Sequence, residues 1–272
     1  TIATAGTLVG LAAPATATAP AADSTLYALT AAGTLLSFPR NAPGTVTTIG
    51  TVTVGLLETI VGLDVRPSTG ELWVLTSGLL GAGRLYTVNP TTAAATLRAT
   101  LAADAADTTA PFGGLIGTQF AMDFNPTGAV ALRIFGATGQ NLRVTDPTTG
   151  ATFTDTDVGT PAPDVVAAAY SNSYPAPAGV TLTTSLYVID LATASLLAQA
   201  PPNDGTLTPI GALSASLTFV GTGGLPGAAA FDIAGGNNGI ALAVLRRHIG
   251  GVPESSSRLY RINLATGVAT EV

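Results

Sequence analysis

Residues 59–76, TIVGLDVRPSTGELWVLT, contain a pattern that recurs along the chain. It runs from small and apolar residues through Asp64 and a Pro-containing turn into a second β-rich run. The same order returns in QFAMDFNPTGAVALRIF (119–135) and AAAFDIAGGNNGIALAVL (228–245), and a degenerate copy, VVAAAYSNS (165–173), carries Tyr170 where the others carry Asp. A fixed unit that recurs along a chain indicates a repeat architecture.

Each copy is followed by strand-like segments of a second kind. These are GRLYTVNPTTAAATL (83–97), QNLRVTDPTTGATF (140–153) and SRLYRINLATGVATEV (257–272). Alternation of apolar residues with period two on both sides of a polar turn is typical of a β-hairpin. Each unit therefore contains several short antiparallel strands.

The spacing of the units predicts how they assemble. The equivalent positions Asp64, Asp123, Tyr170 and Asp232 are 59, 47 and 62 residues apart. Units of about 40 to 60 residues with four short strands each, and no segment of helical period, are typical of a β-propeller. We predict an all-β fold, with one propeller of about five four-stranded blades over residues 25–272.

A tyrosine recurs at one strand position of the repeats, at Tyr27, Tyr86, Tyr187 and Tyr260. We predict that these rings fill the space between neighbouring blades, with hydroxyl groups that reach adjacent loops. A platform for stacking carbohydrate is the alternative interpretation.

Composition excludes several classes of partner. Only 10% of the 272 residues are charged, the net charge is −6, every basic residue is Arg, and Cys is absent. Such a surface offers no electrostatic site for nucleic acid or an anionic membrane. The sequence also has no continuous run of about 20 apolar residues, the length needed to span a bilayer. Weak charge repulsion favours self-association, and a Thr-rich surface without Cys or Lys suits an extracellular setting.

These segments also carry a family resemblance. STLYALTAAGTLLSF, ETIVGLDVRPSTGELWVL, GRLYTVNPTT, FAMDFNPTGAVALRIFGATGQNLRVTDPTTG and SSRLYRINLATG resemble the bacterial secreted family of domain of unknown function 4394, over about residues 25–272. The resemblance implies an exported, propeller-like protein. It supplies no catalytic residue and no established activity.

The N-terminal segment, residues 1–24, reads as a strand on a tether rich in Pro, Ala and Thr. TLVGLAAP (7–14) matches TIVGLDVRP (59–67), with Ala12 in place of Asp64. This strand is needed because the first unit otherwise has only three strands and an unpaired edge. We predict that the residues Thr7, Leu8, Val9, Gly10, Leu11, Ala12 and Ala13 form this strand.

Three interpretations of this segment stay open. The strand completes its own blade, or it completes the blade of a neighbouring subunit, where it forms a subunit interface and propagates a filament. The third is a partly removed export signal, since LVGLAAPATATA has an apolar core and an Ala-x-Ala-like end.

The candidate chemistry lies in three repeated acidic residues. Equivalent positions of a propeller meet around its axis, so Asp64, Asp123 and Asp232 are candidate ligands of a calcium ion, the one cofactor that the sequence suggests. The alternative is that they accept hydrogen bonds from backbone N–H groups of adjacent turns. His248, in LRRHIGG, we interpret as a solvated loop residue, and we predict no catalytic residues.

The sequence therefore predicts a non-enzymatic, secreted structural or interaction protein that self-assembles into an extracellular filament by exchange of the N-terminal strand. The alternative function is that of a monomeric propeller that binds a cation or small ligand at its axis. Enzymatic activity has only the analogy with other propellers behind it.

Overall fold

The structure is a computed structural model, and it describes residues 1–2, 7–17, 21, 23–127, 131–159, 164–214, 218–219, 229–236, 239–249 and 252–272. Within the predicted N-terminal segment, residues 3–6, 18–20 and 22 lie outside the described residues.

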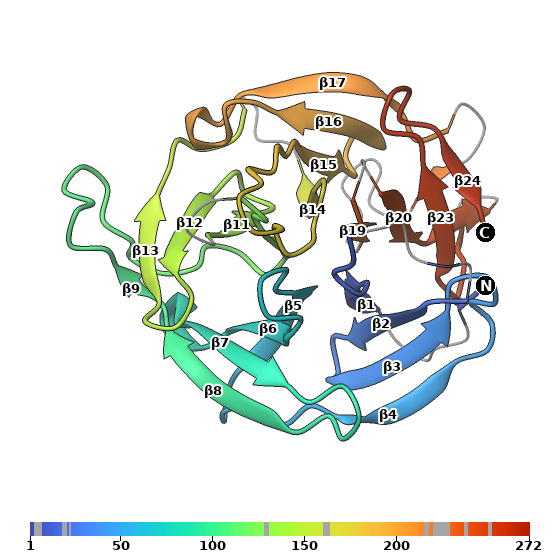
Figure 1. Cartoon of the computed structure of the whole chain (residues 1–272), viewed down its shortest axis with the longest axis horizontal. Coiled ribbons are helices and arrows are strands. Elements are labelled where there is room, and N and C mark those ends of the chain that lie inside the picture. The colour runs from blue at the N-terminus through green and yellow to red at the C-terminus, as the bar shows by residue number, and fades with distance from the viewer. Residues whose placement is uncertain are drawn as a thin grey trace.

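Five four-stranded antiparallel blades form a ring, which confirms the predicted propeller (Figure 1). We number the blades 1 to 5 in chain order, and within each blade the strands are given in order from the axis outward. Blade 1 contains β1 (Leu8–Ala12), β2 (Thr25–Thr30), β3 (Thr34–Pro39) and β4 (Thr47–Thr51). Blade 2 contains β5 (Thr59–Val65), β6 (Leu72–Ser77), β7 (Gly83–Val88) and β8 (Ala95–Thr100).

Blade 3 contains β10 (Phe120–Phe124), β11 (Leu132–Gly136), β12 (Asn141–Asp146) and β13 (Ala151–Thr154), and the short β9 (Ala102–Ala103) pairs in parallel with β13. Blade 4 contains β14 (Val165–Tyr170), β15 (Leu186–Asp190), β16 (Ser195–Gln199) and β17 (Leu207–Ala212). Blade 5 contains β19 (Ala230–Ala234), β20 (Ile240–Leu245), β23 (Arg258–Ile262) and β24 (Ala269–Glu271).

A small separate sheet is formed by β18 (Thr218–Phe219), β21 (Arg247–Ile249) and β22 (Val252–Pro253). Two 3-10 turns, η1 (Leu79–Gly81) and η2 (Pro202–Asp204), lie in connections. No helix in the described part of the chain has the length and apolar character needed to cross a membrane.

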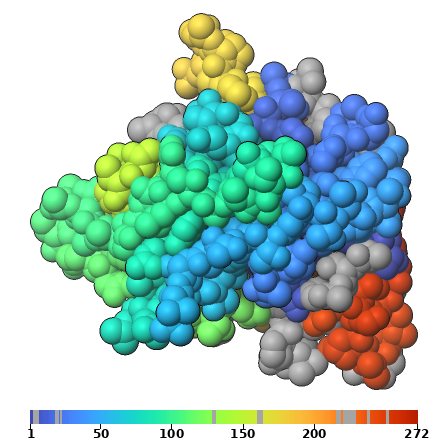
Figure 2. Space-filling view, turned by 90° about the horizontal axis from the view of Figure 1, so that it is seen from below, coloured from blue at the N-terminus to red at the C-terminus, as the bar shows by residue number. Residues whose placement is uncertain are grey.

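The hydrophobic core is divided among the junctions between blades. Among the described residues, buried apolar side chains form five separate clusters, and each cluster combines residues from two neighbouring blades. The inner strands explain this division: β5, β10, β14 and β19 are buried along almost their whole length because both of their faces meet another blade. Outer strands such as β4 and β8 are largely exposed, and their atoms form part of the face shown in Figure 2.

The recurring tyrosines lie at these junctions. Tyr86 and Tyr260 are buried in inter-blade clusters, and Tyr27 and Tyr187 are half-buried against the same kind of cluster. The Tyr86 hydroxyl donates to Glu58 at 2.9 Å and accepts the backbone N–H of Gly55 at 3.2 Å. The prediction that these rings fill the space between blades is confirmed. The prediction for their hydroxyl groups fails at Tyr260, whose buried hydroxyl has no hydrogen-bond partner among the described residues.

β1 completes blade 1 of its own molecule. It pairs antiparallel with β2, with Leu8 opposite Thr30 and Leu11 opposite Ala28. The residues predicted as a subunit interface, Thr7 to Ala13, therefore lie within the ring here, and Leu8, Leu11, Ala12 and Ala13 are buried. Exchange of this strand between subunits stays a prediction.

The ring closes without a shared blade. β1 stays in the first blade and the last strand, β24, stays in blade 5, so the two blades meet by packing. Two backbone groups strengthen the junction: the N–H of Ile2 donates to Ser257 O at 2.8 Å, and the N–H of Ala13 donates to Asp232 Oδ2 at 2.5 Å.

Glycine sets how closely β1 and β5 approach each other. A Cβ added at Gly10 would overlap Leu63 Cβ and lie 2.9 Å from the Leu63 backbone N. We expect Gly10→Ala to force the two inner strands apart and to lower the free energy of unfolding by about 1–3 kcal/mol, measured by urea denaturation. Gly113→Ala is the matched control, because a Cβ at Gly113 meets no atom within 4 Å. Equal losses in both variants would contradict this account.

Candidate metal centre

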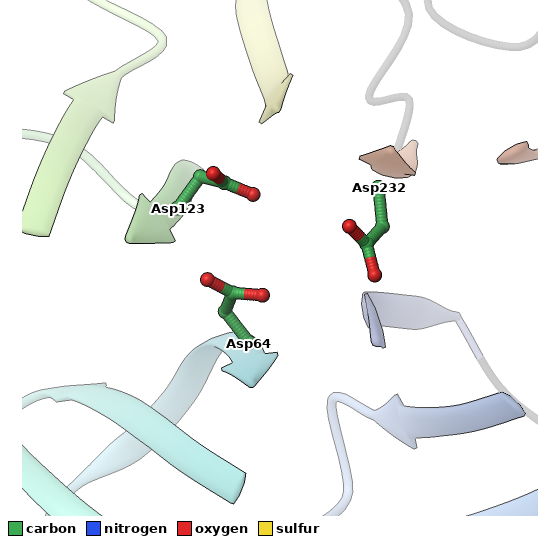
Figure 3. A group of neighbouring side chains, drawn as sticks. All are labelled: Asp64, Asp123 and Asp232. Atoms are coloured by element: carbon green, nitrogen blue, oxygen red, sulfur yellow. The ribbon is translucent and has the colours of Figure 1, made fainter. Parts of the chain in front are cut away.

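Three buried carboxylates converge at the axis of the propeller. Asp64, Asp123 and Asp232 come from the inner strands of blades 2, 3 and 5, and one oxygen from each lies within 4.8 Å of the others. Figure 3 shows their carboxylates turned toward a common centre. The residues are only 3%, 1% and 4% exposed. The sequence prediction that these three positions meet around the axis is therefore correct in geometry.

Each carboxylate also binds the next blade around the ring. Asp64 Oδ2 accepts the backbone N–H of Phe124 at 2.8 Å, and Asp123 Oδ1 accepts that of Tyr170 at 2.9 Å. In the same way Asp232 Oδ2 accepts the N–H of Ala13. The alternative role given to these residues, acceptance of backbone hydrogen bonds, is thus present together with their convergence.

This pattern corrects the alignment of the degenerate repeat. Phe124 and Ala13 are the residues that directly follow the acidic position or its equivalent in their blades, so the equivalent donor in blade 4 is Tyr170. Ala169, and not Tyr170, therefore occupies the acidic position of blade 4. The alignment by sequence was wrong by one residue. Tyr170 resembled a polar replacement of the repeated Asp, whereas Ala169, in a run of alanines, does not stand out from its neighbours. The placement of Ala12 at the acidic position of blade 1 is confirmed.

The two alanines leave two junctions without an acidic link. At these junctions the equivalent N–H group of the following blade bonds to the acidic residue that directly precedes it in its own strand. Val65 N–H donates to Asp64 Oδ1 at 2.6 Å, and Ile233 N–H donates to the Asp232 carboxylate. Backbone groups on both sides thereby hold Asp64 and Asp232 in place. These donors could not be identified from sequence, because every residue except proline has a backbone N–H.

Burial makes the charged form of the cluster costly. It raises the pKa of Asp64 and of Asp123 well above the ordinary value of 3.8, and the neighbouring carboxylates raise both further, while backbone N–H groups offset only part of this. Burial also raises the pKa of Asp232, to about 7, again against the effect of backbone hydrogen bonds. The cluster therefore favours either a bound proton or a bound cation near neutral pH.

The donor set fits a hard divalent cation. Ca²⁺ binds carboxylate oxygens at about 2.3–2.6 Å, so two ligands on opposite sides of one ion lie roughly 5 Å apart, and oxygens within 4.8 Å of each other can share it. Only oxygen atoms are offered, which suits Ca²⁺ better than zinc or copper. Three carboxylates also leave ligand positions for water or backbone oxygen.

His248 does not join this centre. It lies half-buried in β21, opposite Thr218 of β18, so its interpretation as a solvated loop residue is wrong. The flanking residues Arg247 and Ile249 pair with the neighbouring strands β18 and β22 of the small sheet. His248 Nε2 is buried and has no hydrogen-bond partner among the described residues.

The fold and the centre define the class of protein: a five-bladed β-propeller with an acidic cluster on its axis. Its family is one without an assigned activity. The family model named "Domain of unknown function (DUF4394)" matches residues 34–272, and the chain belongs to that family. The resemblance noted from the repeats is confirmed. No curated protein sequence matches the chain.

Solved structures share the fold at very low sequence identity. An engineered GH43 glycoside hydrolase with endo-xylanase and exo-arabinofuranosidase activity is 11% identical, with a TM-score of 0.57 over 98% of this chain and 52% of its own. A GH43_1 enzyme from Xanthomonas citri is 9% identical, with a TM-score of 0.52 over 100% of this chain and 92% of its own.

A structural genomics protein of unknown function from Bacteroides thetaiotaomicron VPI-5482 is 12% identical, with a TM-score of 0.50 over 100% of this chain and 58% of its own. The chain thus spans little more than half the length of two of these three proteins. Likeness at this level of identity extends to the fold alone.

Proposed function

We propose that this protein is a non-enzymatic propeller that binds Ca²⁺ at its axis through Asp64, Asp123 and Asp232. The observation that carries the proposal is the convergence of three fully buried carboxylates on one point. In this role the cation joins blades 2, 3 and 5 and stabilises the ring.

The charge balance of the centre supports a bound cation. The interactions that shift the pKa of Asp64 and Asp123 come from burial, from the other carboxylates and from backbone N–H groups, and no arginine contributes among them. Buried carboxylates are ordinarily paired with a cationic side chain, protonated, or bound to a metal. Near and above neutral pH a divalent cation is the partner that satisfies all three at once.

Calcium is expected to raise the melting temperature at pH 8, where the carboxyls are least protonated. At a free concentration of 100 times Kd the gain is about 2.7 kcal/mol in the free energy of unfolding. Asp123→Asn tests the site sharply, because the amide oxygen can still accept the Tyr170 N–H while one charge is lost. We expect this variant to be more stable than the native protein in EGTA, and to gain much less from calcium.

Asp157→Asn is the matched control, since Asp157 is an exposed acidic residue of the loop that follows β13. Titration calorimetry measures binding directly, and thermal melting measures its effect on the fold. Absence of calcium binding by the native protein at pH 8 would refute the proposal. An Asp157→Asn variant with the same loss as Asp123→Asn would also contradict it.

The inaccessibility of the three axial carboxylates supports a non-enzymatic role for them. The three carboxylates are at most 4% exposed, so a substrate the size of a sugar ring does not reach them in this conformation. We infer a secreted or cell-surface location from the low charge, the absence of Cys and the Thr-rich composition.

Self-assembly by strand exchange is a second candidate, and one observation favours it. β1 is joined to β2 by a connection of twelve residues, Ala13 to Ser24, whereas β2 and β3 are joined by three. A long connection rich in Pro and Ala allows a strand to leave its own blade and enter another molecule. Filaments in electron micrographs of the native protein, dispersed by an excess of a synthetic peptide of residues 1–17, would support exchange. Monomers in the untreated native sample would refute it.

A further inference from the structure

A second axial feature lies at the opposite end of the inner strands from the acidic centre. It is a cavity of about 250 Å³, and its wall includes Val9, Val61, Phe120, Val166 and Ala229. These residues stand three places before the acidic position or its equivalent in blades 1 to 5, so every blade contributes one of them. The cavity is therefore coaxial with the ring.

A second layer, of hydroxyl groups, lines the same cavity. Thr7, Thr59 and Thr118 stand five places before the acidic position in blades 1, 2 and 3, and all three line the cavity. Asp164 has the equivalent place in blade 4 and does not line it; its backbone N–H donates to Asp190 Oδ1 at 3.0 Å. Hydroxyls thus lie over three neighbouring blades.

Below the apolar layer the axis narrows. The residues Gly10, Gly62, Ala121, Ala167 and Ala230 stand two places before the acidic position, and the space along them is only about 20 Å³. This is close to the volume of a single water-sized probe, so an organic molecule does not pass from the cavity to the acidic centre. The cavity is a closed-ended site, and its occupancy is separate from that of the metal centre.

The chemistry of the lining selects its ligand. None of the described residues that line the cavity is charged, so no lining side chain would neutralise a charged ligand, and a charge that entered the buried apolar layer would be unpaired. The apolar layer favours a ligand that buries apolar surface against it, and threonine hydroxyls can both donate hydrogen bonds to the ligand and accept them from it. The volume lies below the usual 300–1,000 Å³ of sites for drug-sized ligands, so the ligand is about as large as one ring with a short substituent.

We propose that the coaxial cavity binds a small uncharged molecule that has an apolar ring and a hydroxyl group. The ring enters the layer formed by Val61, Phe120 and Val166, and the hydroxyl binds the threonine layer. This site is additional to the calcium centre and does not depend on it.

Four probes of one shape test the proposal: benzyl alcohol, toluene, benzoate and benzylamine, each titrated at pH 7 into the whole chain labelled at methyl groups for NMR. We expect benzyl alcohol to bind and to shift the methyl signals of Val9, Val61 and Val166. Benzoate and benzylamine are expected to bind at least about tenfold more weakly, a difference of 1.4 kcal/mol. Equal binding of all four probes, or no binding of benzyl alcohol, would overturn the proposal.

Two kinds of variant distinguish the contribution of the threonine hydroxyls from that of the cavity volume. The double variant Thr59→Val and Thr118→Val keeps the volume and removes two hydroxyls, so it is expected to abolish the preference for benzyl alcohol over toluene. Thr96→Val, at an exposed position of β8, is the matched control and should leave the preference unchanged. Ala229→Leu fills the cavity and should remove binding of both probes.

The same titrations in EGTA and in calcium test whether the cavity binds its ligand independently of the calcium centre. Binding of benzyl alcohol with equal affinity in both supports an independent cavity, whether or not calcium binds. Loss of benzyl alcohol binding in either condition would contradict that independence.

Discussion

Removal of residues 1–13 is expected to prevent the ring from forming. Ile2, Leu8 and Leu11 are at most 2% exposed, and each contributes about 1.5–3 kcal/mol by burial. The deletion also removes the ladder between β1 and β2 and the backbone hydrogen bonds of Ile2 and Ala13 to blade 5. Together these losses are comparable to the whole stability of a domain, about 5–15 kcal/mol. Circular dichroism and the loss of cooperative thermal melting measure the effect.

A synthetic peptide of residues 1–17 supplies the control. If β1 can be exchanged between molecules, the peptide should restore cooperative melting to the deleted chain. A peptide with Leu8→Asp and Leu11→Asp should fail, because both side chains are buried in the blade 5 and blade 1 cluster. A deleted chain that melts like the native protein would contradict the role of β1 as the inner strand of blade 1. Failure of the native peptide would count against strand exchange.

Stability without calcium is expected to fall as the pH rises from about 4 to 7. The pKa of Asp232 is raised by burial from 3.8 to about 7, so within this window the folded protein keeps a proton that the unfolded chain has released. The stabilisation is complete below the unfolded pKa and is lost as the pH rises through the folded one. A shift of this size in one carboxyl of the cluster corresponds to a decrease of about 4 kcal/mol in the free energy of unfolding. Asp64 and Asp123, whose pKa values are raised in the same direction, add to it.

Urea denaturation in EGTA at several pH values measures this decrease. Asp232→Asn, whose amide oxygen can still accept the Ala13 N–H, should remove the part due to Asp232. Saturating calcium should reduce the decrease in the native protein, because the cation takes the place of the proton. Stability that rises between pH 4 and 7 in EGTA, with no change in Asp232→Asn, would be inconsistent with a buried carboxylate cluster.

Sequence patterns predicted the parts of the centre that repeat. Asp64, Asp123 and Asp232 share one flanking pattern, and rotational repetition brings equivalent positions to one axis. The pattern failed at Tyr170, because position within a strand is fixed by hydrogen bonding and not by resemblance of side chains. It failed also at His248, whose strand partner lies in a segment about thirty residues earlier in the chain.

From the sequence alone we could predict the class of fold, a propeller of about five blades, a strand over residues 7–13, which the structure places at residues 8–12, and the three acidic positions. These properties follow from local periodicity and from repetition, which the order of residues records directly. The backbone donors that hold the carboxylates, and the width of the axis, become visible only in the folded molecule. These features join residues that are far apart in the chain: the hydrogen bond from Ala13 to Asp232 links residues 219 apart, and only closure of the ring brings them together.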